Sequence, residues 1–101
     1  MPFLDPEDFI PTTLDVRTLL VKRPSATFFM RVRGDSLVAE RIHDGDLLVI
    51  DRSVEPMEGD MAVLSEDGQL AVRKLEAAVT DDDAFEVWGT VAFSITAHCK
   101  R

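Results

Sequence analysis

The feature that most constrains this chain's fold is a series of short apolar segments separated by glycine and aspartate, beginning after residue 26. Segments this short, rich in β-branched and aromatic residues, are typical of strands rather than helices. Asp67-Gly68 lies between two of them, and such a pair is a strong hairpin signal. The expected strands are 27–33, 47–51, 61–65, 69–75 and 85–97. We therefore predict a mostly β fold, either a small sandwich or a partly closed barrel.

The last expected strand, 85–97, is the longest, and Gly89 in its middle indicates a bulge or a bend. Simple alternation gives this strand one apolar face and one moderately apolar face. The first face carries Phe85, Val87, Gly89, Val91, Phe93 and Ile95; the second carries Trp88, Thr90, Ala92, Ser94 and Thr96. A second subunit could cover such a strand, so we predict a homodimer.

The N-terminal segment has a different composition. Prolines at positions 2, 6 and 11 exclude a regular helix or central strand over residues 1–13, which we expect to form an extended, mobile arm. Residues 14–22 are predicted to form a short helix with Leu14, Leu19 and Leu20 turned inward, ended by Pro24. The expected organisation is an arm and short helix over 1–24 and a β domain over 25–101.

Length and charge limit the function. A chain of 101 residues allows one domain with a thin core. Its net charge of −8 argues against direct nucleic-acid binding, which needs a basic face. Residues 35–86 hold fifteen acids and four bases, so the excess charge lies in the middle of the chain. That region is either a solvated, repulsive surface or a docking face for a basic partner.

Several classes of site find no support in the sequence. The single cysteine, Cys99, excludes an intramolecular disulfide and a cysteine-based zinc site, and we expect a free thiol. The sequence contains no phosphate-binding loop and no dinucleotide-binding motif, so we expect no cofactor. His43 and His98 are expected to be solvated, and Asp44 and Asp46 to form a turn around Gly45. With no apolar run of membrane length and no signal peptide, we expect a cytoplasmic protein without a membrane partner.

One ordered set of motifs is informative. Gly34-Asp35-Ser36-Leu37 is followed by an Asp-Gly-Asp motif and a strand, then by Gly-Asp, then by Val-Arg-Lys-Leu. The full set comprises residues 23–29, 34–37, 44–49, 59–60, 72–75 and 86–91. In this order the motifs resemble the LexA/UmuD family of self-cleaving serine–lysine peptidases, and within it the UmuD branch, the accessory subunits of error-prone polymerases.

The resemblance implies a curved, mostly β fold with an extended N-terminal arm, closing strands that dimerise, and Ser36 in the position of the nucleophile. In this family a neutral lysine activates the serine. Such chemistry is physically sound, because a lysine desolvated by apolar walls can lose its proton near neutral pH. The alternative is that Ser36 has no catalytic role and is a turn residue whose hydroxyl accepts hydrogen bonds from nearby N–H groups.

The first departure from the family concerns the base. The gap-free alignment places Arg73 in the position of the family lysine, and arginine cannot act as a base in a protein. Lys74 is the alternative base. Neighbouring strand residues point to opposite faces, so we expect Lys74 to reach Ser36 only through a register slip or a bulge, which Gly68 could host.

Two further departures concern the substrate. No Cys-Gly or Ala-Gly pair, the kind of site that the family cleaves, precedes Ser36. The chain begins near the start of the family's cleaved form, which we expect of either a naturally short form or a trimmed one. Residues 76–84 replace an extra strand and loop of the family, which should open one side of the cleft.

Three hypotheses follow. The leading one is a homodimeric, UmuD′-like subunit of an error-prone Y-family polymerase of the polymerase V type, acting in translesion synthesis in the SOS DNA-damage response. It would bind a UmuC-like polymerase and have no peptidase activity. The second is an active serine–lysine peptidase using Ser36 and Lys74. The third, the dimerisation half of a phage-type repressor, lacks support because no helix-turn-helix is evident. Whether a RecA filament also engages the protein stays open.

Overall fold

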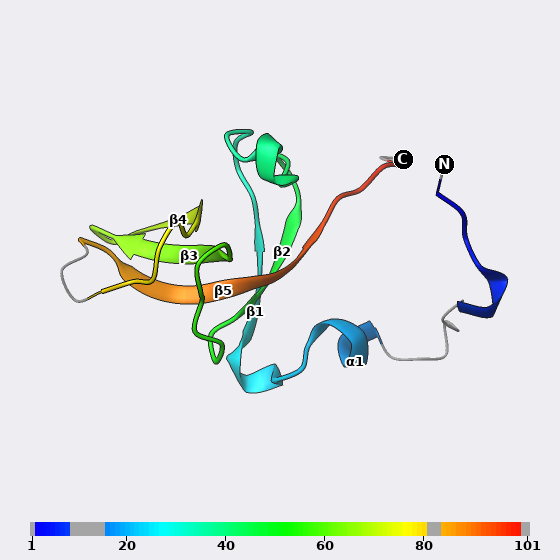
Figure 1. The fold of residues 1–101 in the computed structure, drawn as a ribbon, viewed down its shortest axis with the longest axis horizontal. Coiled ribbons are helices and arrows are strands. Elements are labelled where there is room, and N and C mark those ends of the chain that lie inside the picture. The colour runs from blue at the N-terminus through cyan, green and yellow to red at the C-terminus, as the bar shows by residue number, and fades with distance from the viewer. Residues whose placement is uncertain (1, 9–15, 81–83, 100–101) are drawn as a thin grey trace.

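The computed structural model describes residues 2–8, 16–80 and 84–99. Most of the regular structure in this part of the chain is strand (Figure 1), which confirms the predicted fold class. The strands are β1 (Thr27–Arg31), β2 (Leu47–Asp51), β3 (Met61–Glu66), β4 (Gln69–Lys74) and β5 (Glu86–Ile95). The helices are α1 (Val16–Leu20) and three 3₁₀ turns, η1 (Pro6–Asp8), η2 (Pro24–Ala26) and η3 (Val38–Glu40).

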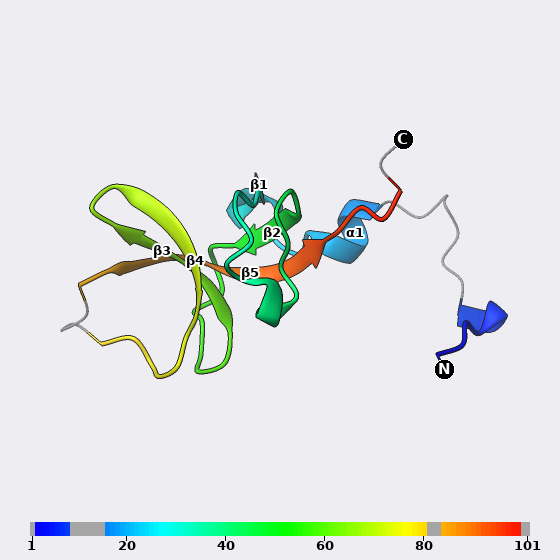
Figure 2. The ribbon, with the colours of Figure 1, turned by 90° about the horizontal axis from the view of Figure 1, so that it is seen from above.

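The strands form one antiparallel sheet in the order β1-β2-β5-β3-β4. β5 is the central strand and joins two halves, β1 and β2 on one side and the β3–β4 hairpin on the other (Figure 1). Figure 2 shows the hairpin at the opposite end of the molecule from the N-terminal segment. The sheet is curved but not closed, because β1 and β4 are its two edges and do not pair with each other.

The β3–β4 hairpin has the predicted Asp-Gly turn. Asp67 and Gly68 both have positive φ, +52° and +81°, as the two central residues of a type I′ turn require. The register then runs without interruption from Glu66↔Gln69 to Met61↔Lys74. The bulge that Gly68 could have hosted, considered as the alternative for Lys74, is therefore absent from this hairpin.

β5 differs from simple alternation at two points. Its register shifts opposite β3, leaving Trp88 unpaired beside Gly89, and again opposite β2, leaving Ala92 unpaired. As a result Trp88 and Val91 pack against one core cluster and Val87 against the other. The bulge predicted near Gly89 is confirmed, and the alternating faces assigned to this strand are wrong.

Gly89 is required by close packing. A Cβ atom built on it would lie 2.7 Å from Cγ2 of Ile50 and 3.3 Å from Cγ of Arg52. Arg52, which follows β2, also contacts this part of β5. Its guanidinium carbon lies 4.2 Å from the Trp88 ring centroid, and its Nε donates to the Trp88 carbonyl at 2.7 Å. β5 therefore packs tightly against the end of β2 at the place where it bulges.

The sheet buries two apolar clusters. The first contains Ile42, Leu48, Ile50 and Val63, and the second contains Ala62, Leu64 and Leu75. Neighbouring residues of β3 alternate between them, Val63 in the first and Ala62 and Leu64 in the second. The clusters therefore lie on opposite faces of the sheet, and each residue of the β3–β4 hairpin can be assigned to one face by its register.

The N-terminal segment contacts the sheet through Arg23. Its guanidinium donates to Oδ2 of the buried Asp51 at 2.9 Å, while Oδ1 accepts from the N–H and hydroxyl of Ser53 at 2.8 and 2.6 Å. The Ser53 hydroxyl, against the opposing effect of burial and with help from Arg23, lowers the pKa of Asp51 below its ordinary value. This carboxylate fastens the start of β1 to the end of β2.

The predicted helix is shorter than expected. α1 covers Val16–Leu20, residues 14–15 lie outside the described part, and none of the residues of α1 is buried. Leu19, expected to turn inward, is 39% exposed. Of the predicted arm, residues 2–8 are described and exposed, with one 3₁₀ turn, and 9–13 are not described.

Candidate functional site

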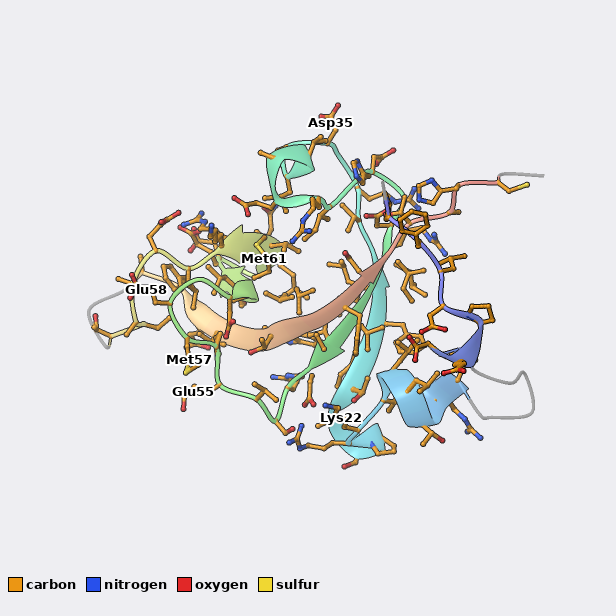
Figure 3. The ribbon with its side chains drawn as sticks, turned by 45° about the vertical axis from the view of Figure 1, so that its right-hand side comes forward. Lys22, Asp35, Glu55, Met57, Glu58 and Met61 are labelled. Carbon is orange, nitrogen blue, oxygen red and sulfur yellow. The ribbon has the colours of Figure 1, made fainter. Side chains whose placement is uncertain are left out.

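Ser36 lies in the loop that follows β1, and it is exposed. Asp35, the residue before it, is at the outer tip of this loop (Figure 3). The loop is held against residues 43–46: the Gly34 N–H donates to Oδ1 of Asp44 at 2.7 Å, and the Gly45 N–H donates to the Val32 carbonyl at 2.9 Å. Gly34 has φ +101°, a conformation that favours glycine. The Gly-Asp-Ser motif thus forms a fixed turn.

Asp46 supports this turn from inside the protein. It is 1% exposed, and its Oδ2 accepts the His43 N–H at 2.8 Å. Burial alone would raise the pKa of Asp46, but the His43 N–H, a hydrogen bond from Thr96 and the positive potential of His43 and His98 together lower it. Asp46 is therefore a buried carboxylate that links the serine loop to the segment after β5.

A cavity of about 370 Å³ opens beside Ser36. Residues from β1, from the serine loop and from β4 line it, so it lies between the two edges of the open sheet. Its walls are mainly apolar, and most of the apolar residues belong to the first core cluster or pack against it, among them Met30, Val32, Leu37, Leu48 and Val72. Leu70, which is exposed, also lines it.

The register of β4 decides which basic side chain shares this cavity's face. Val72 pairs with Val63 of the first cluster, and Lys74, two residues on, therefore lies on the same face as Val72. Arg73 pairs with Ala62 of the second cluster, and its guanidinium carbon is 5.9 Å from the Phe85 ring centroid on that side. Lys74 thus shares the cavity's face without any slip or bulge, and Arg73 does not; whether Lys74 reaches Ser36 is a separate question.

Lys74 has a partner other than Ser36. Its Nζ lies 3.7 Å from Oε2 of Glu40, a residue of the 3₁₀ turn that follows the serine loop. Both side chains are partly exposed, at 42% and 37%. The hydrogen bonds of the described residues include none that joins Ser36 to Arg73 or Lys74. An ion pair uses lysine in its ammonium form, which has no lone pair with which to accept the serine proton.

Sequence reasoning missed three contributions to the site. Glu40 has no motif and is found only through its contact with Lys74. Asp44 and Asp46 were interpreted as turn formers, and the structure adds a side-chain bond to Gly34 and a buried anchor for His43. The Asp-Gly-Asp pattern could have signalled this, because aspartates flanking a glycine often accept backbone N–H groups. His43 and His98 are exposed, as expected.

A second candidate site is an apolar face on the β1–β2–β5 half of the sheet. Phe29, Val49 and Phe93 are register partners across the three strands, and Phe29 and Phe93 are 52% and 39% exposed. Ile95, two residues after Phe93, is 40% exposed. Val49 between them is fully buried, so the exposed apolar surface consists of Phe29, Phe93 and Ile95, which a second protein could cover.

Among the described residues, no group of three or more His, Cys, Asp or Glu side chains could hold a metal ion. None of the helices described is long and apolar enough to cross a membrane.

Comparison with known proteins gives a consistent picture. A family model described as peptidase S24-like matches residues 4–88. Protein SamA of Salmonella typhimurium is 39% identical over 69 residues, 68% of this chain and 49% of that protein. Protein MucA of Escherichia coli is 33% identical over 107 aligned residues, 87% of this chain and 73% of that protein.

More distant similarity extends to a repressor. LexA repressor 1 of Xanthomonas oryzae is 37% identical over 60 residues, 59% of this chain and 29% of the repressor. The chain spans about half the length of several of the curated relatives that it matches, including SamA and Protein ImpA of Escherichia coli.

Proposed function

The chain belongs to the peptidase S24-like family, that of LexA and UmuD. On that premise we propose that the chain is a UmuD′-like accessory subunit of an error-prone polymerase and that it has no peptidase activity of its own. The observation that carries the proposal is Arg73 in the position of the family's lysine, while the motifs around it, from Gly34-Asp35-Ser36 to Val72, are kept. A subunit that only binds a polymerase can lose the catalytic lysine and still function, whereas a serine–lysine peptidase needs that lysine as its general base.

The partner is a Y-family polymerase of the UmuC type, in the SOS response to DNA damage. The similarity to SamA, ImpA and MucA supports membership of the UmuD-like branch. A net charge of −8 supports contact with DNA through the polymerase rather than directly, because phosphate binding requires a basic surface. A cytoplasmic location accompanies this role.

The subunit is proposed to act as a homodimer. The face formed by Phe29, Phe93 and Ile95 is apolar and exposed, and it includes the long strand β5. Burial of such a face gains about 25 cal/mol for each Å² of apolar surface removed from water. A second copy that covers this face supplements the thin core of a chain of 101 residues.

A second function is favoured by one observation. By the register of β4, Lys74 lies on the face of the sheet that borders the cavity lined by Ser36, and the side chain it pairs with is Glu40 rather than the serine. An active peptidase would then use Ser36 as the nucleophile and Lys74 as the base. This alternative predicts that Lys74→Ala removes activity present in the unaltered protein, which the first proposal says is absent.

The experiment is co-purification with a UmuC-type polymerase. The tagged chain and the polymerase are co-expressed, with a cleaved UmuD protein as positive control. We expect stable capture of the polymerase, and equal capture by Ser36→Ala, because binding does not use the serine hydroxyl. Failure of the tagged chain to capture a polymerase that the control captures would refute the proposed role.

A further inference from the structure

The outer edge of β4 is an open pairing site. β4 is an edge strand of the sheet, its six residues contain no proline, and its register shows no bulge. Proline, bulges and charged side chains are devices by which proteins protect edge strands from pairing. β4 has neither a proline nor a bulge along Gln69–Lys74, and its charges, Arg73 and Lys74, both lie at its C-terminal end. The cavity beside Ser36 lies along the same strand.

The turn fixes which backbone groups of β4 point outward. In a two-residue hairpin the residues flanking the turn, here Glu66 and Gln69, form a hydrogen-bonded pair. Bonded and non-bonded pairs then alternate, so Ala71 and Arg73 also bond to β3. The N–H and C=O groups of Leu70, Val72 and Lys74 therefore face the open edge.

The two faces of this edge offer different chemistry. Leu70 and Val72 line the apolar cavity on one face. On the other face Arg73 is exposed and its guanidinium carbon lies 5.9 Å from the Phe85 ring centroid, and the ion pairs of the described residues include none with this guanidinium. A guanidinium is a fixed positive charge with five donors, suited to a carboxylate.

We propose that the edge of β4 binds an extended segment of a partner protein as an added strand, with apolar side chains toward the cavity and an acidic side chain on Arg73. The inference rests on the proposed function, because it makes position 73 a binding residue where the family has a base. Strand addition draws affinity from main-chain bonds and specificity from alternate side chains.

The chain's own arm is a poor occupant. Among the described residues of the arm, Pro6–Asp8 form a 3₁₀ turn instead of an extended strand, and Pro2 and Pro6 have no N–H to donate. A carboxylate at Arg73 meets a fixed positive charge at contact distance, whereas charges more than about 8 Å away are largely screened at physiological salt. A segment of another polypeptide with alternating apolar and acidic residues fits both faces.

The test uses a ten-residue synthetic peptide of alternating valine and glutamate, followed by amide hydrogen exchange and by fluorescence anisotropy. We expect the amides of Leu70, Val72 and Lys74 to become protected, while those of Ala71 and Arg73, already bonded to β3, change little. Replacing glutamate by glutamine in the peptide, or Arg73→Gln in the protein, should weaken binding about threefold to tenfold. Lys74→Gln, which removes the same charge from the other face, is the matched control and should leave the preference for glutamate intact.

Three results would overturn the inference: no protection at these amides, equal affinity for the glutamate and glutamine peptides, or equal effects of Arg73→Gln and Lys74→Gln. Self-pairing of β4 edges, seen by light scattering as a larger species in Arg73→Gln alone, would also overturn it, since Arg73 would then only prevent association. Polymerase capture is measured separately, so protection without capture would refute the proposed partner and not the edge site.

Discussion

Replacing Gly89 by alanine should destabilise the protein by overpacking. The new Cβ would lie 2.7 Å from Cγ2 of Ile50, against 3.4–4 Å for ordinary contact, so one strand must move by several tenths of an ångström. Ile50 is β-branched and 1% exposed, and it has little freedom to turn away. Overpacking of this kind costs about 1–3 kcal/mol.

An opposing effect acts on the unfolded chain. Alanine has less conformational freedom than glycine, which favours folding by about 0.4–1 kcal/mol where the backbone tolerates it. Gly89 does not have the positive φ that would forbid alanine. The clash is the larger effect, so we expect a net loss of about 1–2 kcal/mol, or very roughly 4–16 °C in Tm for a domain of this size.

The assay is urea unfolding followed by Trp88 fluorescence at fixed protein concentration, because a dimer's stability depends on concentration. The midpoint should fall with no change in m. In an Ile50→Ala background, which removes Cγ2, the cost of Gly89→Ala should fall by at least half. A variant within about 0.5 kcal/mol of the parent, or equal costs in both backgrounds, would refute the close approach of β5 to β2.

Three further predictions concern stability, assembly and the arm. Asp46 and Asp51 have lowered pKa values, so their contribution to the free energy of unfolding is present above the unfolded-state pKa of about 4 and is lost as pH falls through the lower folded-state values. Unfolding titrations should show a loss on acidification that is smaller in Asp51→Asn, and an unchanged acid limb in that variant would contradict this. Phe93→Asp should convert a dimer to an 11.3 kDa monomer by light scattering at micromolar concentration, and a monomeric parent would exclude the dimer. Amides of residues 2–8 should exchange rapidly, because these residues are exposed, and strong protection there would show that the arm docks.

The strands were predictable because each is a short apolar segment bounded by residues that favour turns, such as glycine and aspartate. Leu47–Asp51 is apolar on both faces and follows Gly45-Asp46, and its position in the sequence analysis and in the structure is the same. The Asp67-Gly68 turn needs positive φ at both residues, a requirement that few other pairs meet. Helix α1 was less predictable, since its apolar residues find no buried site.

The site was predictable in part. The motif around Ser36 forms a fixed turn, and its supporting carboxylates lie nearby in sequence. The partner of Lys74 was not predictable, because Glu40 meets it only through the folding of η3 against the end of β4. The faces of β5 were misassigned because two bulges each shift the alternation by one residue, and the number of bulges depends on pairing with both neighbours.

The most direct test of the central claim is a cleavage assay. A cleavable UmuD-type arm is supplied in cis or as a peptide, with and without a RecA filament, to the unaltered protein and to Arg73→Lys, Lys74→Ala and Ser36→Ala. Loss of general-base help typically reduces the rate about 10²–10⁴-fold, so we predict no detectable cleavage by the unaltered protein. Cleavage that Ser36→Ala and Lys74→Ala both abolish would contradict the account and establish a working serine–lysine peptidase.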